Sequence, residues 1–99
     1  MRAILLLLLL SVPAQAQDAV SQCDAVSDQA LVVARLMVSG ASFENMIQRS
    51  SDPEWRFLVA KVYRHEKLIA SVNGEQKEQF AKSFAQGELV RCHREYETP

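Results

Sequence analysis

Residues 52–68, DPEWRFLVAKVYRHEKL, contain the clearest helix signal in the chain. Asp52 can cap the first turn, and Pro53 stands at the first helical position, where its missing N–H costs nothing. Apolar and aromatic side chains then recur every three or four residues, at Trp55, Leu58, Val59, Val62 and Tyr63. Because this spacing places them on one face of a helix, we expect the segment to form the central helix of a small bundle.

Three more helices are predicted around this one, and no stretch alternates in the manner of a β-strand. The four helices are expected at residues 18–39, 43–49, 53–70 and 75–95. Gly40 is placed to end the first helix, and Ser42 to cap the second. Gly87 lies inside the last helix, where glycine costs about 1 kcal/mol relative to alanine. We therefore expect either a kink or the close approach of another backbone at Gly87.

The two cysteines, Cys23 and Cys92, stand near the outer ends of the first and last predicted helices. An even number of cysteines in an oxidising compartment favours a disulfide. The bridge would close a loop of about 70 residues, worth on the order of 4 kcal/mol in the chain-entropy model. Bridged cysteines need Cα atoms within about 7 Å, so the short second helix must carry the chain back along the first. The expected fold is all-α, a small four-helix bundle with one short helix, closed by a single disulfide.

Residues 1–16 have the features of a signal peptide. Arg2 supplies a positive start, residues 3–12 are apolar apart from Ser11, and Ala14-Gln15-Ala16 has the small-x-small pattern of a cleavage site. A membrane anchor is the alternative, but a spanning helix needs about 20 apolar residues. We expect cleavage near Ala16, which leaves one helical domain at residues 17–99 in the periplasm or outside the cell. No stable membrane insertion of this mature chain is expected.

The charges of the chain are nearly balanced, with 11 Lys and Arg against 12 Asp and Glu and a formal net charge of −1. Nucleic-acid-binding domains usually show a clear basic excess on one face. We therefore expect no nucleic-acid partner. The balance of charge and the 48% hydrophobic content also argue against a disordered chain.

The possible metal ligands in the sequence are Cys23, Cys92, His65 and His93. Zinc motifs pair ligands a few residues apart, whereas Cys92 and His93 are adjacent and point to different sides of a helix. No CxxC or HExxH motif is present, and no serine lies in a GxSxG or SxxK motif. We expect a disulfide with two surface histidines, no metal or other cofactor, and no catalytic activity.

The third predicted helix has a basic side opposite its apolar face. The candidate binding surface on this side consists of Arg56, Phe57, Lys61, Arg64 and Lys67. Such a surface can meet anionic lipid, a polyanion or an acidic protein, and a protein is the expected class of partner. The alternative is an ordinary solvated face whose cations pair with aspartates of the first helix. Trp55 and Phe57 are two residues apart and cannot share one narrow face, so one of them is expected outside.

The chain combines several short features: an early and a late cysteine, Ala34-Arg35 leading to Gly40, Ser42-Phe43-Glu44 and Val62-Tyr63. In this layout the chain resembles a group of small exported two-cysteine helical proteins of proteobacteria with no assigned activity. None of the shared motifs is catalytic. In architecture alone, the chain is similar to the periplasmic acid-stress chaperones, which are tiny four-helix proteins with one disulfide. That likeness implies opening at low pH.

These observations favour an exported helical protein of binding or structural type. Two other functions remain open from the sequence. One is an acid- or stress-responsive periplasmic chaperone, and the other is a secreted inhibitor or immunity-type protein that acts by surface contact. A small enzyme would need a cleft with convergent polar groups, for which the sequence offers no candidate.

Overall fold

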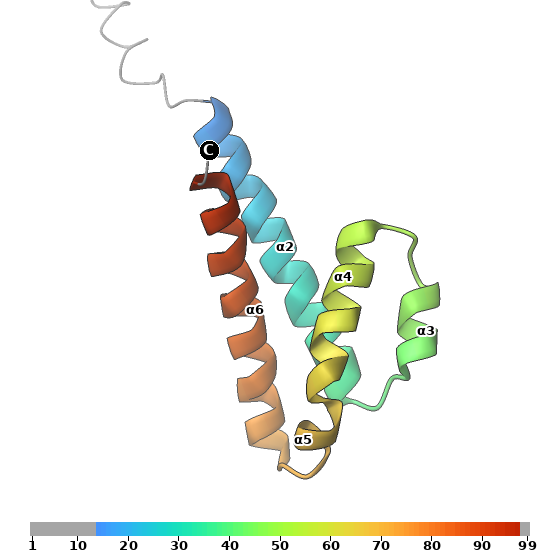
Figure 1. Cartoon of the computed structure of the whole chain (residues 1–99). Helices are drawn as coiled ribbons and strands as arrows, with labels where there is room; N and C mark the ends of the chain where they lie inside the picture. The colour runs from blue at the N-terminus through green and yellow to red at the C-terminus, as the bar shows by residue number, and fades with distance from the viewer. Residues whose placement is uncertain (1–13, 98–99) are drawn as a thin grey trace, which may run out of the picture.

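The computed structural model describes residues 14–97, which are almost entirely helical and contain no strand (Figure 1). In chain order the elements are α2 (Ala14–Val38), α3 (Phe43–Gln48), α4 (Pro53–Val62), the 3₁₀ turn η1 (Tyr63–His65), α5 (Glu66–Ala70) and α6 (Gly74–Glu97). With α4, η1 and α5 taken as one interrupted helix, this is the predicted all-α arrangement of four helices. Residues 1–13, which hold most of the predicted signal peptide, lie outside the described residues.

The chain runs alternately in opposite directions along the long axis of the bundle (Figure 1). Helices α2 and α6 form an antiparallel pair that makes most of the contacts between helices, α4 packs against α2, and α3 packs on α4. The Cys23–Cys92 disulfide joins α2 to α6, with a Cα–Cα distance of 5.5 Å across 69 residues of sequence. Both the bridge and the returning path through the short second helix are therefore confirmed.

The core lies where α4 meets the α2–α6 pair. The apolar face predicted for the third helix is buried, since Leu58, Val59 and Val62 are fully inaccessible to solvent. They form one buried cluster with residues of the other helices, namely Ala30, Val33, Ala34 and Met37 of α2, Met46 of α3, and Ala81 and Ala85 of α6. The small side chains of α2 and α6 let these two helices approach closely, and the Ser27 hydroxyl donates a hydrogen bond to the Ala85 carbonyl at 3.2 Å.

The short helix α3 is held by its cap and by aromatic side chains of the following segment. As predicted, Ser42 caps it by accepting a hydrogen bond from the Asn45 amide at 3.1 Å. The Trp55 indole donates to the Met46 carbonyl at 2.7 Å, and the Tyr63 hydroxyl donates to the Ala41 carbonyl. Burial, reinforced by the nearby Glu66 carboxylate, raises the pKa of Tyr63. These contacts supply the stability that a helix of six residues lacks on its own.

Two details of the predicted helices differ in the structure. The third helix is interrupted at Tyr63–His65, and this 3₁₀ turn begins at Tyr63, the last residue of the apolar pattern on which the prediction of the helix rests. In α6, the helix continues through Gly87, and no atom lies within 4 Å of the position that a Cβ would occupy. Of the two alternatives expected at Gly87, the close approach of another backbone is therefore wrong.

Removing the disulfide by Cys23→Ala together with Cys92→Ala should lower the free energy of unfolding by about 2–4 kcal/mol, because the unfolded chain loses its crosslink. Urea denaturation followed by circular dichroism measures this change. A reductant should bring the wild-type protein to the same stability and leave the double variant unchanged. Equal stability of oxidised and reduced wild type would contradict the prediction.

Candidate functional site

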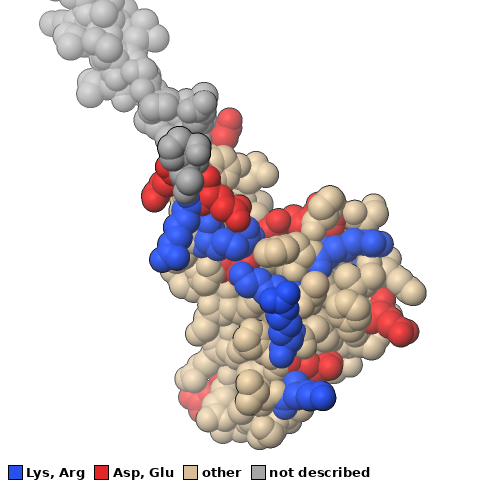
Figure 2. All heavy atoms as spheres, in the orientation of Figure 1, with Lys and Arg blue, Asp and Glu red and all other residues tan. Residues whose placement is uncertain are grey.

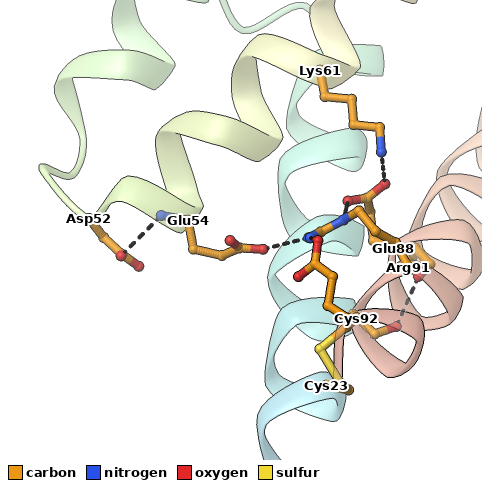
Figure 3. Close-up of polar contacts among 10 residues, drawn as sticks. Cys23, Asp52, Glu54, Lys61, Glu88, Arg91 and Cys92 are labelled. Atoms are coloured by element: carbon orange, nitrogen blue, oxygen red, sulfur yellow. Dashed lines mark hydrogen bonds and ion pairs between the residues drawn. A yellow bond between two sulfur atoms is a disulfide. The ribbon is translucent and has the colours of Figure 1, made fainter. Parts of the chain in front are cut away.

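A network of charged side chains connects the facing sides of α4 and α6 (Figure 3). At its centre lies Glu88 of α6, whose residue surface is only 3% exposed. One carboxylate oxygen, Oε2, lies 2.6 Å from Lys61 Nζ of α4, and the other, Oε1, lies 2.7 Å from Arg91 Nε. Since both oxygens have a cationic partner, the buried charge is compensated on each side.

Arg91 extends the network with its two remaining nitrogens. Nη2 lies 2.8 Å from Glu54 Oε1 at the start of α4, and Nη1 lies 2.8 Å from Glu95 Oε1 one turn further along α6. Partial burial acts to lower the pKa of Arg91, but the hydrogen bonds to Glu88 and Glu95 outweigh it and raise the pKa above its usual range. Arg91 therefore remains a cation that binds three carboxylates at once.

Glu54 reaches Arg91 from a helix start that the sequence predicted. Asp52 accepts a hydrogen bond from the Glu54 amide at 3.2 Å and caps α4, while Pro53 occupies its first turn. Figure 3 shows the Glu54 side chain pointing from α4 toward Arg91. The cap thus fixes the position from which α4 contributes its carboxylate.

Phe57 lies over the outer side of this network. Its ring centroid is 4.8 Å from Arg91 Cζ and 5.6 Å from Lys61 Nζ, distances at which a cation is attracted to an aromatic face. The residue remains 46% exposed. Trp55, by contrast, is half-buried against α3, so the prediction that one of these two aromatic residues lies outside is confirmed.

The five residues of the candidate binding surface are distributed over two environments. Lys61 and Phe57 belong to the charge network, whereas Arg64 and Lys67 are exposed on η1 and α5. Arg56 is exposed as well, and its Nε donates to the Ser50 carbonyl at 3.1 Å. The alternative, in which this basic side pairs with aspartates of the first helix, does not hold for Lys61, because its partner is Glu88 of α6.

Glu88 is the functional candidate that the sequence analysis missed. It lies on the same face of α6 as the buried residues Ala81, Ala85 and Cys92, spaced by four, three and four positions. A glutamate inside such an apolar series is the available sequence signal, because a carboxylate is rarely buried without a partner. The pattern alone does not identify that partner, which comes from another helix.

The remaining polar groups of the described chain form no second cluster of this kind. Arg35 and Glu78 make an exposed pair with a shortest distance of 2.5 Å, and the hydrogen bond from Arg35 lowers the pKa of Glu78. His65 packs against Phe80 with the two rings tilted, at a centroid distance of 5.5 Å. Within residues 14–97, no three His, Cys, Asp or Glu side chains are grouped to hold a metal ion, and both cysteines are in the disulfide.

An open hollow lies at the far ends of α2 and α6, away from the α4 side chains. Its lining includes Val20, Ser21, His93 and Tyr96.

Among residues 14–97, no helix has the length and apolar character needed to cross a membrane. Comparisons with protein-family models, with curated proteins and with solved structures give no significant match for this chain.

Replacing Glu88 with Gln should lower the free energy of unfolding by about 2 kcal/mol, because Lys61 and Arg91 lose the charge that compensates them in a partly buried site. Urea denaturation at neutral pH measures the loss. Glu78→Gln, which breaks the exposed Arg35 pair, is the matched control and should have a much smaller effect. Equal effects of the two substitutions would show that the network does not hold α4 to α6.

Proposed function

We propose that the chain is an exported helical binding protein that acts by surface contact and not by catalysis. The observation that carries this proposal is an exposed strip along α4, η1 and α5, where two large apolar side chains lie among cations. Phe57 is 46% exposed and Leu68 is 72% exposed. We call this surface the α4–α5 face and define it by Arg56, Phe57, Lys61, Arg64, Lys67 and Leu68. Exposed apolar groups bordered by polar residues are typical of interaction surfaces.

Export is supported by the sequence of residues 1–16 and by the disulfide. Cleavage near Ala16 would remove the first three residues of α2 and leave Cys23 within the first turns of the mature helix. Disulfides persist in the periplasm and outside the cell but are rare in the cytosol. The proposed location is therefore the periplasm or the extracellular space.

The way α4 is held supports binding by a preformed surface. Its inner side is buried in the core, and Lys61, Glu54 and Phe57 tie it to Glu88 and Arg91 of α6. A surface that is already ordered loses little conformational entropy when a partner binds. The α4–α5 face has this support along its α4 half.

In-cell photo-crosslinking tests the proposed function. A benzoylphenylalanine placed at position 57 or at position 68 should form adducts with a partner in cells that export the protein. The same group at Val32, which is 49% exposed on α2, provides the control and should form none. Mass spectrometry of the adducts identifies the partner as protein or lipid. If positions 57 and 68 give no more adduct than position 32, the proposal is wrong.

One defined protein adduct would favour the secreted inhibitor or immunity-type function.

The acid-responsive chaperone is favoured by a different observation, the carboxylates that hold α4 on α6. Two ion pairs join α4 to α6, Glu54–Arg91 and Lys61–Glu88, so acid that neutralises carboxylates would remove both pairs and free α4. Glu78 acts in the same direction, because its pKa is lowered in the fold by the Arg35 hydrogen bond. Its contribution is present above the unfolded pKa and is lost as the pH falls.

For the chaperone function, the wild-type protein should suppress aggregation of an acid-sensitive client near pH 3 and not at pH 7, because acid exposes Leu58, Val59 and Val62. Light scattering of the client measures the effect. Glu88→Gln should shift the onset of suppression to higher pH, and Glu78→Gln should shift it less. Absence of suppression at every pH at which the client aggregates would exclude this alternative.

A further inference from the structure

The α4–α5 face combines apolar side chains and cations in a helical repeat. Phe57 of α4, Arg64 of η1 and Leu68 of α5 are all exposed and are spaced by seven and four residues, the repeat of one side of a helix. Arg56 and Lys67 flank this row. Both apolar side chains are large, and they lie at opposite ends of the row with the cations between and beside them.

The cations of this face are available to an anionic partner. Within residues 14–97, Arg64 and Lys67 form no ion pair, and Arg56 donates only to a backbone carbonyl. Glu66 is the exposed carboxylate of the same segment, and Lys61 is already paired with Glu88. Figure 2 shows Lys and Arg atoms running across one side of the molecule, with Asp and Glu atoms beside them. The face therefore carries a net positive charge.

We propose that the α4–α5 face attaches the protein peripherally to an anionic lipid bilayer. This inference rests on the proposed function and names its partner. The observations favour a bilayer over an acidic peptide because Phe57 and Leu68 are exposed singly, at opposite ends of the row, whereas helical peptides dock into apolar grooves. The open hollow of the structure lies elsewhere, at the ends of α2 and α6.

In this attachment the apolar and the cationic side chains contact different layers of the bilayer. Phe57 and Leu68 enter the boundary between headgroups and acyl chains, and Arg56, Arg64 and Lys67 contact the lipid phosphates. Two apolar side chains give little depth of insertion, so much of the binding depends on charge. The association is consequently reversible and weakened by salt.

Sedimentation with lipid vesicles tests the inference on the protein purified after export with its disulfide intact. It should bind vesicles of phosphatidylglycerol and phosphatidylcholine, bind vesicles of phosphatidylcholine alone about tenfold or more weakly, and dissociate as salt rises. Arg64→Gln with Lys67→Gln should weaken binding to the anionic vesicles about tenfold or more. Arg49→Gln with Lys82→Gln makes the same change in total charge away from the face and should bind nearly as well as wild type.

The apolar residues need a separate pair of variants. Phe57→Ser with Leu68→Ser should weaken binding to the anionic vesicles at all salt concentrations, whereas Val32→Ser should not. Circular dichroism of each variant confirms that the fold is retained. Failure to bind anionic vesicles, or equal loss in the Arg49–Lys82 control, would overturn the inference. Protein adducts from position 57 together with no vesicle binding would leave the proposed function standing and refute only the lipid partner.

Discussion

The Cys23–Cys92 disulfide joins the two longest helices near their outer ends, and α4 packs against one of them, α2. Alanines make up much of the buried surface of these two helices. Small side chains allow close approach but bury little apolar area, and a chain of this length has little surface to bury in any case. A covalent link across the antiparallel pair compensates by restricting the unfolded chain. The direction of every other helix then follows from the length of its connections.

Glu88 determines the orientation of α4 relative to the α2–α6 pair. A buried ion pair rarely stabilises a fold more than apolar residues of the same size would, so its value here is geometric. Lys61 and Glu54 are seven residues apart on α4, and both must face Glu88 and Arg91 of α6. This requirement fixes the rotation of α4 about its axis. It consequently directs Leu58 and Val59 into the core and leaves Phe57 at the surface.

Features that depend on neighbours in sequence were predictable, and features that depend on contacts between helices were not. The caps at Ser42 and Asp52 and the apolar face of α4 follow from local spacing and were found as predicted. The disulfide was predictable because only one intramolecular pairing exists. The role of Glu88 was not, since its partners come from α4 and the order of the chain does not show which sides of two helices meet. The interruption at Tyr63–His65 begins at the last residue of the apolar repeat, and beyond Tyr63 the sequence pattern sets no constraint.

Surface binding and chaperone action require α4 to be in different positions, and the charge network controls which position it takes. Binding through the α4–α5 face requires α4 to stay seated, because its outer residues keep their order only while Lys61 and Phe57 are held by α6. Chaperone action requires α4 to leave, because the apolar groups that would bind a client are Leu58, Val59 and Val62 on its inner side. Surface binding requires the ion pairs between α4 and α6 to be intact, whereas chaperone action requires them to be broken. At neutral pH these carboxylates keep α4 in place, so surface binding is the function that the folded state serves directly, and client binding belongs to a protonated state in which that surface is lost.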